Sequence, residues 1–175
     1  MKTTSNNFFI AFAVLFTCQV FAQPSNSIIT ENTVGPEDIE IILGDWTGSL
    51  TYIDYSSNKP YTMPADVSVK QDKNKNKLTL NFKYPNEPNA NSKGQISISK
   101  KGDKINKEIV VSKQELSNEQ LEIITEYNGK DNKKKALIRN KYILGSNQFV
   151  IRKEVRFENS NEWIMRNEYS FERLD

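Results

Sequence analysis

From Trp46 onward, apolar and polar residues alternate with a period of two, and the alternation continues to the end of the chain. Successive side chains of a β-strand point to opposite faces, so this pattern predicts strands that are buried on one face only. The residues expected on the buried face include Trp46, Gly48, Leu50, Tyr52, Leu78, Leu80, Phe82, Ile105, Ile109, Val111, Phe149, Ile151, Val155 and Phe171. The opposite face carries mainly Lys, Glu, Arg, Asn, Ser and Thr. The pattern therefore restricts the chain to an all-β fold.

Short polar segments, among them 56–60, 128–132, 145–146 and 159–161, separate about nine of these strands. Their length and their content of Asn, Gly, Ser and Pro are typical of hairpin turns, so consecutive strands should be antiparallel. A long meander with one apolar face avoids exposed edges by closing on itself. We predict an antiparallel up-and-down meander closed into a barrel of about 8–10 strands.

A short helix is expected just before the first strand. Pro36 can begin a helix, Glu37 and Asp38 place acids in its first turn, and Gly44 can end it. We therefore predict one or two helical turns over 37–43, which would plug one end of the barrel.

The first residues, 1–22, are typical of a secretory signal peptide, with Lys2, an apolar run from Phe8 to Phe16 and small residues near Ala22. Cleavage near Ala22 would make the protein secreted or periplasmic. The polar segment 23–34 is interpreted as a flexible linker, and 35–175 as the barrel domain. In the alternative interpretation, residues 15–18 resemble a lipobox, and the protein is anchored to a membrane through a lipid on Cys18.

Cys18 is the single cysteine, and the chain has no histidine. Removal of the signal peptide would leave no thiolate, imidazole or disulfide, so we predict no catalytic residues, no metal site and no cofactor. Lys and Arg exceed Asp and Glu by a formal charge of +2, spread along the chain. The basic clusters 73–77 and 133–135 are expected at loop tips, and no nucleic-acid partner is predicted.

Gly44-x-Trp46 after a helical turn, together with Arg173 at the end of the last strand, resembles the calycin superfamily, and lipocalin-like barrels in particular. In that superfamily, Gly-x-Trp opens the first strand and an Arg of the last strand packs across the Trp. The resemblance implies that Trp46 and Arg173 meet and close one end of the barrel.

Six of the seven tyrosines fall on the inward face, which indicates a polar lining, because a buried hydroxyl needs a partner. If 145–146 is a two-residue turn, Lys153 lies diagonal to Asn140, and if Phe157 faces Trp163 across the next turn, Lys153 lies opposite Asn167. These three residues would form a polar handle for the head group of a ligand. The candidate ligand-binding residues are Tyr52, Asp54, Tyr84, Tyr127, Asn140, Tyr142, Lys153, Asn167 and Tyr169.

The predicted function is non-enzymatic binding of a small hydrophobic or amphipathic molecule inside the barrel. Only Asp54 among the acids is expected to point inward, whereas Glu108 and most other glutamates are expected to point outward, which argues against a pair of catalytic carboxylates. The alternative is a structural or protein-interaction module of the bacterial envelope with a packed interior. Outward residues of alternating charge, Arg152, Glu154, Arg156, Arg166 and Glu168, would then pair across strands.

Overall fold

A computed structural model describes residues 32–116 and 119–173. The predicted signal peptide, Cys18 and most of the predicted linker lie outside the described residues. The described chain contains helix α1 (Pro36–Glu40), a 3-10 turn at Pro88–Ala90, and the strands β1 (Gly44–Ile53), β2 (Pro60–Pro64), β3 (Asp66–Gln71), β4 (Lys77–Lys83), β5 (Ser92–Ser97), β6 (Lys104–Ile105), β7 (Glu108–Glu115), β8 (Leu121–Asp131), β9 (Lys134–Leu144), β10 (Gln148–Phe157) and β11 (Ile164–Arg173).

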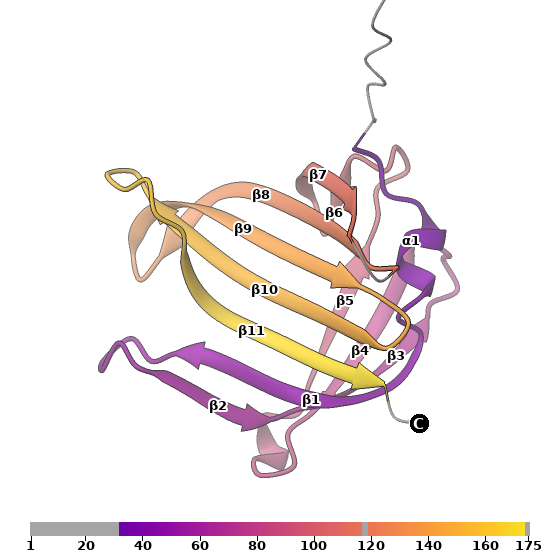
Figure 1. Ribbon diagram of the computed structural model, residues 1–175, viewed down its shortest axis with the longest axis horizontal. Helices are drawn as coiled ribbons and strands as arrows, with labels where there is room; N and C mark the ends of the chain where they lie inside the picture. Colours follow the sequence, from indigo (N-terminus) through magenta and orange to yellow (C-terminus); the bar gives the residue numbers. More distant parts are fainter. Residues whose placement is uncertain (1–31, 117–118, 174–175) are drawn as a thin grey trace, which may run out of the picture. The chain divides into compact units, whose positions relative to one another are not determined.

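The strands form one antiparallel sheet in the order β5-β4-β3-β1-β11-β10-β9-β8-β7-β6, and β2 pairs with β1 beyond the end of β3. A single bridge between Ile98 and Ile105 joins the two ends of this order. The result is a nearly closed barrel, which confirms the predicted meander. In Figure 1, β8 to β11 form one wall and β3 to β5 cross behind it. Helix α1 lies at one end of the barrel, and the β8–β9 and β10–β11 turns lie at the other.

Helix α1 and the turn after it plug the first end. Ile39 and Ile42 are fully buried there, beneath the fully buried Trp46. The indole Nε1 of Trp46 donates a hydrogen bond to the carbonyl of Ile42 at 2.9 Å. This bond satisfies both the indole, which has only one donor, and a carbonyl left free where the helix ends.

Arg173 fastens the last strand to this plug. It lies opposite Trp46 in the β1–β11 register, with its guanidinium carbon 4.2 Å from the centre of the indole ring. The same guanidinium donates to the carbonyls of Ile41 and Leu43, each at 2.9 Å, and to that of Ser146. The structure thus brings Trp46 and Arg173 together at the end of the barrel where the sequence pattern places them.

The barrel domain begins earlier along the chain than residue 35. Val34 is only 3% exposed, and its N–H donates to the carbonyl of Gly102 at 3.0 Å. The Asn32 side chain donates to the carbonyl of Val111 and accepts from the N–H of Lys113. Residues 32–34, expected in the flexible linker, are therefore packed on the barrel.

Two turns differ from the sequence prediction. Residues 128–131 belong to β8, and the β8–β9 turn is Asn132 and Lys133, whose φ angles of 44° and 66° are those of a tight hairpin turn. After β9, Leu144 pairs with Phe149, so the loop is longer than the predicted two residues. The longer loop places Asn140 directly opposite Lys153 instead of diagonal to it.

The β6–β7 hairpin reverses the faces predicted for β7. Its turn consists of Asn106 and Lys107, with φ angles of 51° and 73°, and Ile105 pairs with Glu108. Because paired residues share a face, Glu108 lies on the inner face with the buried Ile105. The prediction that Glu108 points outward was wrong, and so was the inward placement of Ile109, which is 57% exposed. The two-residue turn interrupts the alternation, so the residues after it lie on the face opposite to the predicted one.

We predict that Arg173→Met lowers the free energy of unfolding by about 2–4 kcal/mol, because it removes a cation–π contact and charged hydrogen bonds to the plug. The matched control is Arg152→Met, which removes outward ion pairs to Glu154 and Glu168 and should cost less than about 1 kcal/mol. Urea unfolding of both variants measures the difference. Equal losses would show that Arg173 is no more than a surface charge.

Candidate functional site

The strand register arranges the inward side chains of β1 and β8 to β11 in rows that run across the strands. The row nearest the plug, above Trp46, is apolar and contains Gly48, Phe171, Phe149, Leu144 and Leu121. The next row contains Leu50, Tyr169, Ile151, Tyr142 and Ile123. The third row, here called the polar row, contains Tyr52, Asn167, Lys153, Asn140 and Thr125.

The predicted handle residues Asn140, Lys153 and Asn167 are therefore direct neighbours in the polar row. Lys153 lies opposite Asn140 on one side and Asn167 on the other, and it is half-buried. Among the described residues, the side chains of Lys153 and Asn167 make no hydrogen bond or ion pair. The barrel wall thus presents an amine and an amide to the interior, and neither has a partner within residues 32–116 and 119–173.

Glu108 completes this part of the interior from β7. Its carboxylate oxygen Oε2 accepts hydrogen bonds from the Thr125 hydroxyl at 2.6 Å and the Asn140 amide at 2.8 Å. Thr125 is fully buried, so its hydroxyl needs this acceptor. Sequence reasoning missed Glu108, although Asn-Lys between two strand segments is a possible two-residue turn that would have indicated its inward direction.

An interior pocket of about 170 Å³ adjoins the polar row. Its walls combine aromatic, aliphatic and a few polar residues: Leu80, Phe82, Gly94, Gln95, Ile96, Asn106, Tyr142, Ile151 and Tyr169. Tyr142, Ile151 and Tyr169 each lie two positions along their strand from a handle residue. The pocket is close in size to a cavity that holds one benzene ring, and smaller than the usual range of about 300–1,000 Å³ for drug-sized ligands.

Two tyrosines of the predicted site form a pair beside this pocket. The hydroxyls of Tyr84 and Tyr169 are 2.7 Å apart, and the Tyr169 ring stacks on Phe171 and lies against Phe82. Burial, followed by the hydrogen bond with Tyr84, raises the pKa of Tyr169. Its hydroxyl therefore stays protonated at neutral pH.

Tyr142 and Tyr127 lie on either side of the polar row. Tyr142 is 5% exposed, and burial, followed by the charge of Glu108, raises its pKa. Tyr127 is 36% exposed, and the same two causes raise its pKa. Both side chains are therefore neutral hydrogen-bonding groups near Glu108.

Asp54 does not contribute to the interior, contrary to the sequence prediction. Its Oδ1 accepts hydrogen bonds from the N–H and the hydroxyl of both Ser56 and Ser57, at 2.6–3.0 Å. These bonds, led by that of the Ser56 side chain, lower the pKa of Asp54 to about 2. Asp54 therefore stabilises its own turn, while its neighbour Tyr52 remains in the polar row.

A second polar cluster spans the end of the barrel opposite the plug. Asp131, 3% exposed, accepts hydrogen bonds from the Tyr55 hydroxyl at 2.6 Å and from Nε of Arg166 at 2.8 Å. Arg166 is the extra residue of a bulge between Met165 and Asn167, which turns it away from the outward face expected for it. The cluster connects the β1–β2 turn and β11 to the end of β8. The charges of Asp131 and Arg166 compensate each other, and their contact stabilises this end of the barrel.

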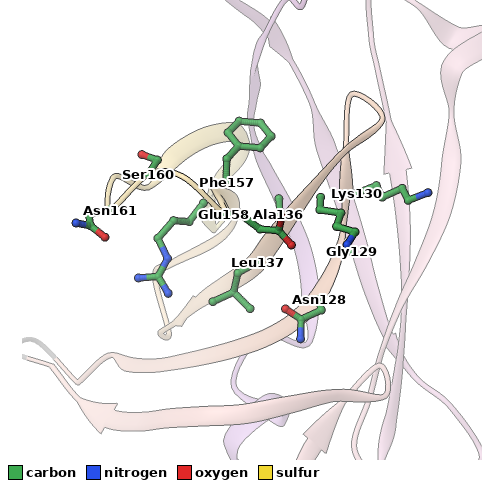
Figure 2. Close-up of a pocket in the computed structure, with 11 residues that line it drawn as sticks. Asn128, Gly129, Lys130, Ala136, Leu137, Phe157, Glu158, Ser160 and Asn161 are labelled. Carbon is green, nitrogen blue, oxygen red and sulfur yellow. The ribbon is translucent and has the colours of Figure 1, made fainter.

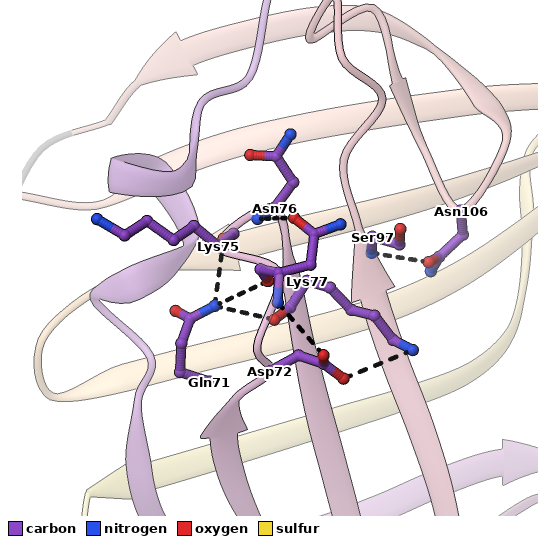
Figure 3. A network of polar contacts seen from close by, with 8 residues as sticks. Gln71, Asp72, Lys75, Asn76, Lys77, Ser97 and Asn106 are labelled. Atoms are coloured by element: carbon purple, nitrogen blue, oxygen red, sulfur yellow. Dashed lines mark hydrogen bonds and ion pairs between the residues drawn. The ribbon is translucent and has the colours of Figure 1, made fainter.

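The seam between β5 and the β6–β7 hairpin is closed partly by a side chain. Asn106 accepts a hydrogen bond from the N–H of Ser97 at 3.0 Å (Figure 3). Its amide also donates to the carbonyl of Gln95 at 3.0 Å. Since Asn106 and Gln95 also line the interior pocket, the pocket reaches this seam.

The basic segment 73–77 forms the β3–β4 turn, as expected of a loop tip. Figure 3 shows the Gln71 amide donating to the carbonyls of Asn74, Lys75 and Lys77, while the Lys77 amine lies 3.7 Å from Asp72. The turn is held by local bonds.

A hollow of about 800 Å³ forms a groove at the ends of β8 to β10. It is lined by Asn128, Gly129, Lys130, Lys135, Ala136, Leu137, Arg156, Phe157, Glu158, Ser160 and Asn161. Figure 2 shows Leu137 between Asn128 on one side and the turn residues Ser160 and Asn161 on the other. Lys130 and Lys135 pair directly across two strands, an arrangement of like charges that costs stability.

Arg156 is held in this groove without a carboxylate partner. Its guanidinium lies 4.9 Å from the centre of the Trp163 ring, whose centre is 3.9 Å from the guanidinium of Arg139. Arg139 is paired with Glu126, whereas Arg156 makes no ion pair among the described residues. The groove therefore carries three cations and one acid, Glu158.

Within residues 32–116 and 119–173, no group of three or more Cys, Asp or Glu side chains is placed to hold a metal ion. No helix in the same part of the chain is long and apolar enough to cross a membrane.

Comparison with known proteins supports the fold alone. No protein-family model and no curated protein matches the sequence. The crystal structure of Rv2717c from M. tuberculosis is similar, with a TM-score of 0.52 and 11% identity over 82% of this chain and 99% of that one. A protein of unknown function from the DUF3598 family of Nostoc punctiforme aligns over 81% of this chain and 50% of its own length, at 11% identity and a TM-score of 0.37. The likeness to Rv2717c and the observed strand order fit a calycin-like barrel fold.

We predict that Tyr84→Phe and Tyr169→Phe each cost about 1–2 kcal/mol, because each leaves the other hydroxyl without its partner. The double variant should cost no more than the larger single loss, since replacing both partners by apolar groups of the same shape is nearly neutral. Urea unfolding of the three variants gives the coupling energy. Additive losses would mean that the two hydroxyls do not depend on each other.

Proposed function

We propose that this protein is a secreted or periplasmic, non-enzymatic binding protein that holds one small amphipathic molecule inside its barrel. The export of the protein rests on the signal peptide predicted at 1–22. The interior site comprises the pocket and the handle residues Asn140, Lys153 and Asn167.

The observation that carries this proposal is the Lys153 amine, which faces the interior without a hydrogen-bond or ion-pair partner among the described residues. A charge inside a protein is costly unless a counter-charge or hydrogen bonds compensate it. The side-chain amide of Asn167, directly opposite, also makes no hydrogen bond within the described part of the chain. A ligand head group placed between them would supply the missing bonds, and its apolar part would enter the adjoining pocket.

The acids of the interior favour binding over catalysis. Glu108 is engaged by Thr125 and Asn140, and Asp131 by Tyr55 and Arg166. Carboxylates held in this way support the barrel wall, and they do not face each other as the pair of a glycosidase does.

The first test is native mass spectrometry of the protein purified from its own host, followed by denaturing extraction of any molecule released. We expect a stoichiometric small molecule, and we expect Lys153→Met to weaken its binding at least tenfold, because a hydrogen bond to a charged group is worth about 1.5–3 kcal/mol. Lys70→Met, which removes an exposed lysine of β3, is the matched control and should bind normally. A bare mass in the wild type would contradict the proposal.

The groove at the ends of β8 to β10 favours a second candidate function, that of an interaction module with an acidic protein partner. Lys130, Lys135 and Arg156 face this groove with no carboxylate partner among the described residues. The stacking of Arg156 on Trp163 limits its freedom, which lowers the entropy lost when an acidic group binds.

A polyglutamate peptide tests this candidate by fluorescence anisotropy. The variant Lys130→Gln/Lys135→Gln should weaken binding at least tenfold, whereas Lys100→Gln/Lys101→Gln, which removes the same charge from an exposed loop outside this groove, should not. Equal losses would show that net charge alone attracts the peptide and would remove the groove as a docking site.

A further inference from the structure

The interior holds two opposite charges that do not neutralise each other. Glu108 lies on β7 and Lys153 on β10, and Asn140 on β9 lies between them. Both side chains are half-buried. No ion pair joins them, and Lys153 has no other carboxylate partner among the described residues.

Their separation follows from the strand order. Glu108 reaches past β8 to the Asn140 amide at 2.8 Å, while Lys153 starts one strand beyond Asn140. Neighbouring strands are about 4.8 Å apart, so β7 and β10 lie three spacings, or roughly 14 Å, apart along the wall, and Glu108 covers part of this distance by reaching Asn140 on β9. The hydrogen bond from the Asn140 amide holds the Glu108 carboxylate on the β8 side of Asn140, away from the Lys153 amine.

Each charge also keeps a free bonding position. Both hydrogen bonds to Glu108 use Oε2, so Oε1 accepts none among the described residues. The three N–H donors of Lys153 bond to none of the residues that the structure describes, and the Asn167 amide beside it can also donate. The wall thus offers an anionic acceptor on one side and a group of donors on the other.

We infer that the interior site binds a zwitterion, an α-amino acid with a small apolar side chain. Its carboxylate would lie against Lys153 and Asn167, and its ammonium against Oε1 of Glu108. A purely anionic ligand would meet the negative charge of Glu108, and a neutral one would leave both charges without partners.

The pocket limits the side chain of this ligand. Its 170 Å³ adjoins the polar row through Tyr142, Ile151 and Tyr169, and Leu80 and Phe82 line it as well. A space of this size takes one aromatic ring or a branched aliphatic group. Leucine and phenylalanine are therefore the natural probes.

This inference rests on the proposed function, and the experiment separates the two. Isothermal titration calorimetry compares L-leucine with L-leucinamide, which lacks the carboxylate charge, and with N-acetyl-L-leucine, which lacks the ammonium. We expect L-leucine to bind at least tenfold more tightly than either blocked form. L-phenylalanine, tested in parallel, should bind as a second zwitterion.

Two variants test which protein charge binds the ammonium of the ligand and which binds its carboxylate. Glu108→Gln should remove the preference for L-leucine over N-acetyl-L-leucine and keep the preference over L-leucinamide. Lys153→Met should have the converse effect, and Lys70→Met should preserve both preferences. Circular dichroism and urea unfolding show whether each variant is folded. If Glu108→Gln does not fold, the Lys153→Met result and the comparison of the three wild-type ligands decide the question.

The outcomes are distinct. N-acetyl-L-leucine or L-leucinamide binding as well as L-leucine would overturn the zwitterion inference and leave interior binding intact. The same holds if no probe binds but native mass spectrometry reveals a different bound molecule. If no probe binds and the native mass is bare, the proposed function fails together with the inference.

Discussion

The interior of this barrel depends on the contact between Arg173 and the end of the barrel that Trp46 closes. One guanidinium stacks on the indole and bonds to two carbonyls of the turn after α1. It therefore ties the first strand, the last strand and the plug at one point. The β1–β11 register that starts from this pair places Tyr52 opposite Asn167, which completes the polar row. A shift of one residue in this register would move the inward side chains of the shifted strand to the outer face of the barrel.

Much of the fold could be predicted from the period of two, because a half-buried strand needs an apolar residue at every second position. The same pattern placed Lys153 opposite Asn167 correctly. The errors have local causes. A two-residue turn at Asn106 and Lys107 changed the face of Glu108, and a bulge at Arg166 added one residue that alternation cannot reveal. Asp54 followed the inward alternation, but serines two and three residues later donate hydrogen bonds to its carboxylate and hold it in the turn.

The two polar clusters of the barrel differ in a way that bears on function. At the end opposite the plug, Asp131 meets both a phenol and a guanidinium, so its charge is compensated by the protein itself. In the polar row, Glu108 is only partly compensated and Lys153 is not compensated at all by the described residues. Clusters of the first kind fix a structure, whereas the second kind leaves bonding capacity for another molecule. Sequence patterns alone do not distinguish them, because both consist of polar residues on an inward face.

The pairing of β1 with β11 also governs how the chain can fold. Every other pairing in the strand order joins segments close in sequence, whereas this one joins the first strand to the last. Contacts between distant segments form slowly, because the entropy of closing the chain is lost before the contact stabilises it. Hairpins such as β8–β9 and β10–β11 can therefore form early, whereas the pairing of β1 with β11 forms late. Until that pairing forms, the inward face of the sheet is open to solvent between β1 and β11.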